Sequence, residues 1–144
     1  MKFIIALVTF ACIAIGQSEA SGAAIVAAAR SQIGLPYIFG GGDIHGKTKG
    51  GFDCSGLSLY AVFKGTGKTL AHGATSQAND SRCHHVPFAQ HQPGDLLFYG
   101  SPGNYYHVVI VSGPNTVIHA PKEGDHVKEA HVWSGHTNFV ARCW

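Results

Sequence analysis

The apolar residues of this chain are spaced as in helices over its first half and alternate as in strands over its second half. Three helices are predicted in the first half, over about residues 23–32, 53–64 and 75–80. Four strands are predicted in the second half, over about residues 96–99, 107–111, 116–120 and 138–143. This order predicts an α+β domain, with the helices packed on one face of a mostly antiparallel sheet.

The first 20 residues have the composition of a secretory signal peptide. Lys2 precedes an apolar run over 3–15, and Ser18 and Ala20 fit a small-residue cleavage site. The run is shorter than the ~20 residues that cross a bilayer. We therefore expect residues 1–20 to be removed on export, and residues 21–144 to form one domain that is secreted to the extracellular or periplasmic space without membrane attachment. An uncleaved membrane anchor is the alternative interpretation.

The charge of the chain argues against a nucleic-acid partner. Lys2 and Glu19 would leave together with the signal peptide, so the formal net charge of +2 is unchanged by cleavage. This charge is too small, and the Lys and Arg residues are too dispersed, to form a basic nucleic-acid groove. Weak attraction to an anionic cell wall is compatible with it.

The secreted chain would contain three cysteines, an odd number, because Cys12 lies in the leader. In an oxidising compartment the odd thiol is either reactive or pairs between chains. We favour a disulfide between Cys83, in a polar loop, and Cys143, next to the C-terminus, which would leave Cys54 free. A disulfide that includes Cys54 is the alternative, and it would contradict a catalytic role for that residue.

Cys54 lies where a chain can activate a thiol. It follows a glycine-rich segment and Asp53, a plausible N-cap, at the start of the second predicted helix. The positive end of the helix dipole is expected to lower the pKa of the thiol. A thiol nucleophile also needs a base and a group that orients the base. His107, at the start of one predicted strand, and His119, near the end of the next, meet this need, since facing residues on neighbouring strands lie within about 5 Å.

Several short motifs resemble those of the NlpC/P60 family of cell-wall cysteine peptidases. In chain order they are Gly34-Leu35-Pro36-Tyr37-Ile38-Phe39-Gly40-Gly41, Phe52-Asp53-Cys54-Ser55-Gly56-Leu57, Gln77, Pro93-Gly94-Asp95-Leu96, His107-Val108 and Ile118-His119-Ala120-Pro121. The resemblance covers almost all of the chain after residue 20. It implies a papain-like α+β fold and hydrolysis of peptidoglycan stem peptides, after γ-D-glutamate and before a diamino acid. It implies no cofactor and no metal, and we expect a monomer.

The resemblance also assigns the catalytic roles. Cys54 matches the nucleophile, His107 the general base and acid, and His119 the residue that orients the base. The backbone N–H of Cys54, at the start of the helix, is the expected donor to the oxyanion.

Three further residues match substrate-binding positions of the family. Tyr37 matches a tyrosine that lines the site near the thiol. Asp53 and Ser55 match residues that help to hold the N-terminal amine in relatives that cut free-ended stem peptides. This pairing is chemically reasonable, because an ammonium group favours a carboxylate and a second acceptor.

Two departures from the family pattern leave other functions open. Phe39 stands where the family often has tryptophan, and Val109 stands where it often has glycine. If Val109 packs against the helix of Cys54, its bulk must be absorbed by a shift. The alternatives are a non-catalytic wall-binding module on the same fold, and a different thiol reaction such as amide hydrolysis elsewhere in the wall or acyl transfer.

A zinc site near Cys83 is a further possibility raised by the sequence. His84, His85 and His91 lie close to this cysteine along the chain. Their spacing matches no standard ligand pattern, so we do not expect a metal there.

Overall fold

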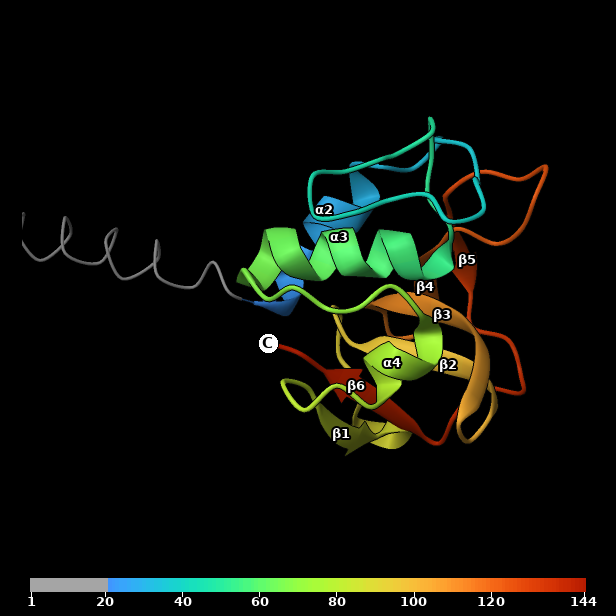
Figure 1. Ribbon diagram of the computed structural model, residues 1–144. Coiled ribbons are helices and arrows are strands. Elements are labelled where there is room, and N and C mark those ends of the chain that lie inside the picture. Colours follow the sequence, from blue (N-terminus) through green and yellow to red (C-terminus); the bar gives the residue numbers. More distant parts are fainter. Residues whose placement is uncertain (1–20) are drawn as a thin grey trace, which may run out of the picture.

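A computed structural model of the chain describes residues 21–144, and the predicted leader at 1–20 lies outside the described residues. The helices are α2 (Gly22–Arg30), α3 (Cys54–Thr66) and α4 (Ala74–Ala78). All three pack against the same side of a six-stranded sheet (Figure 1). The predicted α+β arrangement is therefore confirmed.

The strands are β1 (His84–Pro87), β2 (Leu96–Ser101), β3 (Asn104–Gly113), β4 (Thr116–His119), β5 (Lys128–His131) and β6 (Phe139–Arg142). A short 3-10 helix, η2 (Phe88–Gln90), follows β1. Their order across the sheet is β1-β6-β2-β3-β4-β5. Every pair of neighbouring strands is antiparallel. The last strand, β6, therefore lies between the first two, and β3 and β4 form a hairpin near the middle of the sheet.

The largest differences from the prediction are two additional strands and the start of β3. β1 and β5 were not predicted, because each has four residues and only one of the eight side chains is buried. β3 begins at Asn104, three residues earlier than expected, because a tight turn joins it directly to β2. His107 is therefore the fourth residue of its strand and not the first.

The central strands divide the apolar side chains into two layers. The helix-side core contains Phe98, Val108 and Ile110 together with the buried residues of the three helices. The far-side core is smaller and contains Leu97 and Val109 among its members. Val109 therefore packs on the face away from the helix of Cys54, and its bulk does not press on that helix.

The ends of α3 follow from its sequence. The Asp53 side chain caps the first turn by accepting a hydrogen bond from the N–H of Gly56 at 2.8 Å. Gly67, with φ of 82°, ends the helix in the left-handed conformation that glycine adopts without strain. Gly56 is required for a different reason, since a Cβ there would lie 1.8 Å from the carbonyl oxygen of Gly41. The glycine of the Asp-Cys-Ser-Gly motif thus lets the glycine-rich segment lie directly against the start of α3.

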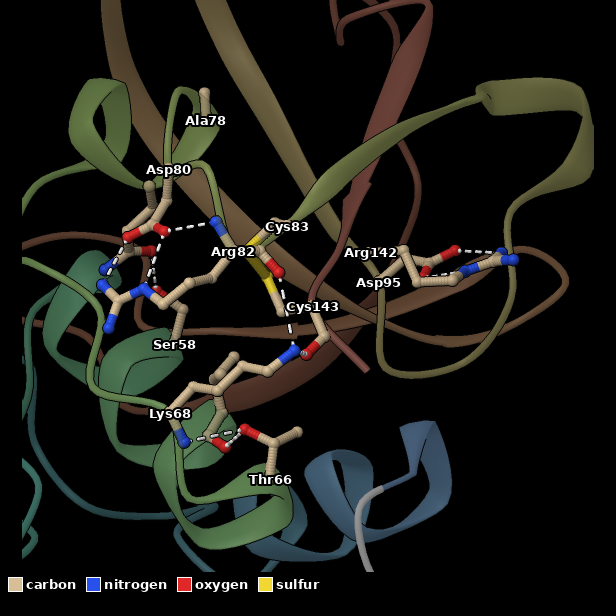
Figure 2. The surroundings of a disulfide bond; sticks show 12 residues. Ser58, Thr66, Lys68, Ala78, Asp80, Arg82, Cys83, Asp95, Arg142 and Cys143 are labelled. Carbon is tan, nitrogen blue, oxygen red and sulfur yellow. Dashed lines mark hydrogen bonds and ion pairs between the residues drawn. A yellow bond between two sulfur atoms is a disulfide. The ribbon is translucent and has the colours of Figure 1, made fainter.

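The C-terminal segment is held by a disulfide and two polar contacts. Cys83 and Cys143 are joined, and Figure 2 shows that Lys68, just after α3, reaches the carbonyl oxygen of Cys143 at 2.8 Å. Nearby, Arg142 donates two hydrogen bonds, of 2.8 and 2.9 Å, to the fully buried carboxylate of Asp95. The aspartate of the Pro-Gly-Asp motif therefore has a structural role in joining β2 to β6.

None of the helices formed by residues 21–144 combines the length and apolar character needed to span a membrane.

Candidate active site

Cys54 is the first residue of α3, and its thiol is free. The side chain is partly exposed and packs against the edge of the helix-side core. A backbone hydrogen bond links the thiol to Val108 on β3. The fold thus brings Cys54 beside the residue that follows His107, from a position more than 50 residues away in the sequence.

The expectation of a lowered thiol pKa is wrong. Burial raises the pKa of Cys54, because apolar surroundings disfavour the charged thiolate. The backbone hydrogen bond from Val108 acts in the opposite direction, and the charge of Asp53 raises the pKa further. The amides at the start of the helix favour the thiolate as expected, but the effect of burial is larger. At neutral pH the resting side chain is a neutral thiol.

His107 and His119 form a buried pair on adjacent strands. Nε2 of His107 lies 2.8 Å from Nδ1 of His119, and the two rings meet edge to face. The two residues are only 7% and 6% exposed. When Nε2 of His107 donates this hydrogen bond, Nδ1 of the same ring keeps the lone pair that a base needs. No hydrogen bond joins the Cys54 thiol to His107 within residues 21–144, and such contacts are often loose before substrate binds.

Burial keeps both histidines neutral. It lowers the pKa of His107 to about 4, and it is also the main cause of the fall in the pKa of His119 to about 4. The neighbouring His107 and Lys128 lower the pKa of His119 further, while Asp125 raises it. Nε2 of His119 is buried and has no hydrogen-bond partner among residues 21–144. The pair can therefore accept a proton but does not hold one at neutral pH.

Trp133 covers the histidine pair, and the sequence analysis did not identify it. The indole lies 5.2 Å from the ring of His119 and 5.9 Å from that of His107, measured between centroids. It stacks on Tyr99 at 4.3 Å, and the Tyr99 hydroxyl donates a hydrogen bond to the carbonyl oxygen of Trp133. Trp133 lies in the connection between β5 and β6, where no periodic pattern marks it as a site residue.

Tyr37 lies close to the thiol. Its pKa is raised by burial first and then by the nearby Cys54 and Asp53. The backbone of Tyr37 forms a bridge with Phe52. The glycine-rich segment therefore presents the phenol beside the start of α3.

Ser55 and Gln77 hold the first turn of α3 in place. Ser55 is buried, and its carbonyl oxygen accepts hydrogen bonds from the amide of Gln77 at 2.9 Å and from the hydroxyl of Ser58 at 3.1 Å. Gln77 is fully buried and is also bonded to the side chain of Ser58. Gln77 was recognised only as a motif residue, and the structure shows that it connects α4 to the turn that carries Cys54.

The carboxylate of Asp53 is already bound by three donors. Oδ1 accepts from the N–H of Gly56 at 2.8 Å and from Nε2 of His72 at 2.7 Å, while Oδ2 accepts from the N–H of Gly40 at 2.9 Å. Asp53 is 8% exposed. His72 was not identified from the sequence, because it lies in an irregular segment between α3 and α4.

The histidines near Cys83 do not form a zinc site. Cys83 is bonded to Cys143, and both ring nitrogens of His91 lie within 2.8 Å of backbone carbonyl oxygens. No group of three or more His, Cys, Asp or Glu residues between 21 and 144 is arranged to hold a metal ion.

The model of the NlpC/P60 family matches residues 34–142. The chain is 43% identical over 121 residues to "Peptidoglycan endopeptidase RipA" of Mycolicibacterium smegmatis, covering 78% of this chain and 24% of that protein. The chain spans about a quarter or less of the length of this protein and of two other curated relatives that it matches.

Two solved structures have the same fold. One is the peptidoglycan hydrolase RipB from Mycobacterium tuberculosis, with a TM-score of 0.76 and 37% identity over 85% of this chain and 64% of that one. The other is RipD from the same organism, with a TM-score of 0.74 and 30% identity over 85% of this chain and 97% of that one. RipD is described as a non-catalytic NlpC/P60 domain protein adapted to peptidoglycan binding.

Proposed function

Because this chain belongs to the NlpC/P60 family, we propose that it is a secreted cysteine endopeptidase that hydrolyses the stem peptides of bacterial peptidoglycan. Its bond of choice lies after γ-D-glutamate and before a diamino acid. Residues 1–20 direct export, and residues 21–144 act as a monomer in the extracellular or periplasmic space.

The observation that carries this proposal is the combination of a free thiol at the first residue of α3 with a buried histidine pair on β3 and β4. The other two cysteines of residues 21–144, Cys83 and Cys143, are joined in a disulfide, which leaves Cys54 available as the nucleophile. His107 serves as the general base and His119 orients it, forming a Cys-His-His triad.

The resting protonation state defines the first chemical step. The thiol of Cys54 and the ring of His107 both begin neutral, so His107 removes the thiol proton as the sulfur attacks the peptide carbonyl carbon. The negative charge that develops on the carbonyl oxygen is stabilised by the backbone N–H of Cys54. His119 accepts a hydrogen bond from the imidazolium that forms.

Collapse of this intermediate completes the cycle. The carbon–nitrogen bond breaks, and His107 returns its proton to the leaving amine of the diamino acid. Water, deprotonated by His107, then attacks the thioester and releases the new carboxylate and the thiol. No cofactor takes part in either step.

Tyr37, Asp53 and Ser55 form the substrate-binding part of the proposal. The phenol of Tyr37 lies near Cys54 and Asp53, where it can contact the residue on the acyl side of the bond. Asp53 and Ser55 flank the nucleophile in the sequence and are suited to interact with the N-terminal end of the stem peptide.

Digestion of purified sacculi and of a defined stem tetrapeptide tests this function. Mass spectrometry should detect a new amine on the diamino acid, and Cys54→Ala should reduce the rate by about a thousandfold or more. His84→Ala, on the exposed edge strand β1, is the matched control and should retain the wild-type rate. Absence of cleavage by the wild-type protein, or undiminished cleavage by Cys54→Ala, would refute the proposal.

A wall-binding module without catalysis is the second candidate. Two observations favour it: the pKa of Cys54 is raised, and the similar RipD domain is described as non-catalytic. Retention on sacculi without release of any new amine would support this candidate over the peptidase. Other thiol reactions, such as a different amidase or acyl transfer, would be recognised by the identity of the product.

A further inference from the structure

The side chain of His72 forms a hydrogen bond with a carboxylate oxygen of Asp53, next to the proposed nucleophile. Its Nε2 lies 2.7 Å from Oδ1 of Asp53, the residue that precedes Cys54. The His72 side chain is 35% exposed, whereas that of Asp53 is only 11% exposed. A carboxylate only accepts hydrogen bonds, so Nε2 of His72 carries the proton in this contact.

The other two donors to Asp53 belong to the fixed backbone. The N–H of Gly56 is part of the helix cap, and the N–H of Gly40 belongs to the segment that lies against α3. Neither can leave without disturbing the first turn of α3. His72 is the one side-chain donor of the three, and it is the partner that a ligand approaching from solvent can displace.

We propose that His72 is a specificity-determining residue, which holds the Asp53 carboxylate and so makes the site select stem peptides whose N-terminal amine is not free. This inference rests on the proposed function of the site. An ammonium group that approaches Oδ1 of Asp53 would have to break the hydrogen bond from His72, because this oxygen already accepts two hydrogen bonds. An acylated amine carries no charge and needs no carboxylate partner, so it leaves the hydrogen bond between His72 and Asp53 intact.

The contact between His72 and Asp53 gives a physical reason for this chain to prefer stem peptides with an acylated N-terminus, as an endopeptidase would. A stem peptide that is still attached to the glycan through its amine presents an amide at this position. Free-ended peptides compete with His72 for Oδ1, so their binding is weakened by the strength of one charge-assisted hydrogen bond. We expect this to amount to about a tenfold preference or more for the acylated form.

Two stem tetrapeptides that differ only in N-acetylation provide the test. The ratio of kcat/KM for the free-amine peptide to that for the acetylated peptide is measured for the wild type, His72→Ala and His72→Gln. Removal of the histidine should raise this ratio by about tenfold. His84→Ala, on β1, is the control and should leave the ratio at its wild-type value. An unchanged ratio in both His72 variants, or equal losses on both peptides, would overturn the inference in favour of a purely structural contact.

A binding measurement keeps the inference independent of catalysis. In a Cys54→Ala background, the dissociation constants of the same two peptides are compared by calorimetry with and without His72→Ala. We expect the free-amine peptide to gain about tenfold in affinity relative to the acetylated one. An unaltered ratio of dissociation constants would refute the role of His72. Absence of cleavage in the kinetic arm, with the expected shift in binding, would instead refute only the peptidase function.

Discussion

The rings of His107 and His119 lie beside the aromatic side chains of Tyr99 and Trp133. Trp133 is 37% exposed, so one face of the indole lies against the histidine rings while part of it meets solvent. Removal of water from around an imidazole disfavours its charged form. Trp133 therefore contributes to the low pKa values of both rings, although it donates no hydrogen bond to either.

The acid limb of the pH–rate profile should report this burial. In the proposed mechanism His107 must be neutral to accept the thiol proton. The wild-type kcat/KM should therefore be retained above the pKa of His107, which is about 4, and should be lost as the pH falls through this value. In Trp133→Ala the rings gain solvent, and the pKa should return toward 6.5, the value of an ordinary histidine. We expect the acid limb to move upward by about one pH unit, with the loss of activity concentrated below pH 6.

A conservative substitution separates burial from general damage. Trp133→Phe keeps an aromatic ring over the pair and should retain most of the wild-type acid limb. If Trp133→Ala lowers the rate equally at all pH values, the indole acts on substrate or on folding and not through the protonation of His107.

At the scale of elements, α2, α3 and β2 to β4 could be predicted because each has a strong local signal. Ser21 and Asp53 are caps, and the central strands alternate between two buried layers. The short strands β1 and β5 could not be predicted, because their side chains are mostly exposed and only the pairing with β6 and β4 defines them as strands.

The same distinction applies to the site. Cys54, His107 and His119 occur in recognisable motifs, and the fold pairs His107 with His119 and places the thiol of Cys54 beside Val108. Trp133 and His72 lie in irregular segments, and their importance depends on contacts with residues 14 to 34 positions away along the chain. Such contacts leave no periodic pattern in the sequence. The raised pKa of the thiol was missed for a related reason, because burial is set by tertiary packing.

The close approach between α3 and the glycine-rich segment leads to a prediction for Gly56. A methyl group at this position would lie 1.8 Å from the carbonyl oxygen of Gly41, which is far inside van der Waals contact. Gly56→Ala must therefore push the segment and the helix apart, although alanine is the better helix former. We expect a loss of about 2 kcal/mol or more in the free energy of unfolding, measured by urea denaturation.

Gly46→Ala is not a suitable control for this change, because that glycine has a φ of 122°. Ser76→Ala, at an exposed position in α4, is better matched, since it adds no atoms to a buried contact. It should change the stability by less than about 0.5 kcal/mol. Wild-type stability in Gly56→Ala would contradict the close approach of Gly41.

At the scale of the whole molecule, the C-terminal segment closes the fold. β6 lies between β1 and β2, and the disulfide from Cys143 joins this segment to Cys83, 60 positions earlier in the chain. The ion pair between Asp95 and Arg142 adds a second link, and it is buried at the carboxylate. Figure 1 shows the C-terminus near the last turn of α3, at the opposite end of that helix from Cys54. The contacts that hold the C-terminal segment and the proposed nucleophile thus lie at different ends of the same helix.

Removal of the disulfide should therefore weaken the fold much more than the site. In the double variant Cys83→Ser and Cys143→Ser, the unfolded chain regains the freedom that a link across 60 residues removes, which the chain-entropy account values at about 4 kcal/mol. We expect the free energy of unfolding to fall by about 2–4 kcal/mol. Well below the unfolding transition, kcat/KM on a stem tetrapeptide should stay within about twofold of the wild type, because Lys68 and the Asp95–Arg142 pair still hold the segment. Urea denaturation and steady-state kinetics under the same non-reducing conditions test both expectations. A large loss of kcat/KM in a variant that is still fully folded would show that the C-terminal segment positions the site as well as stabilising the fold.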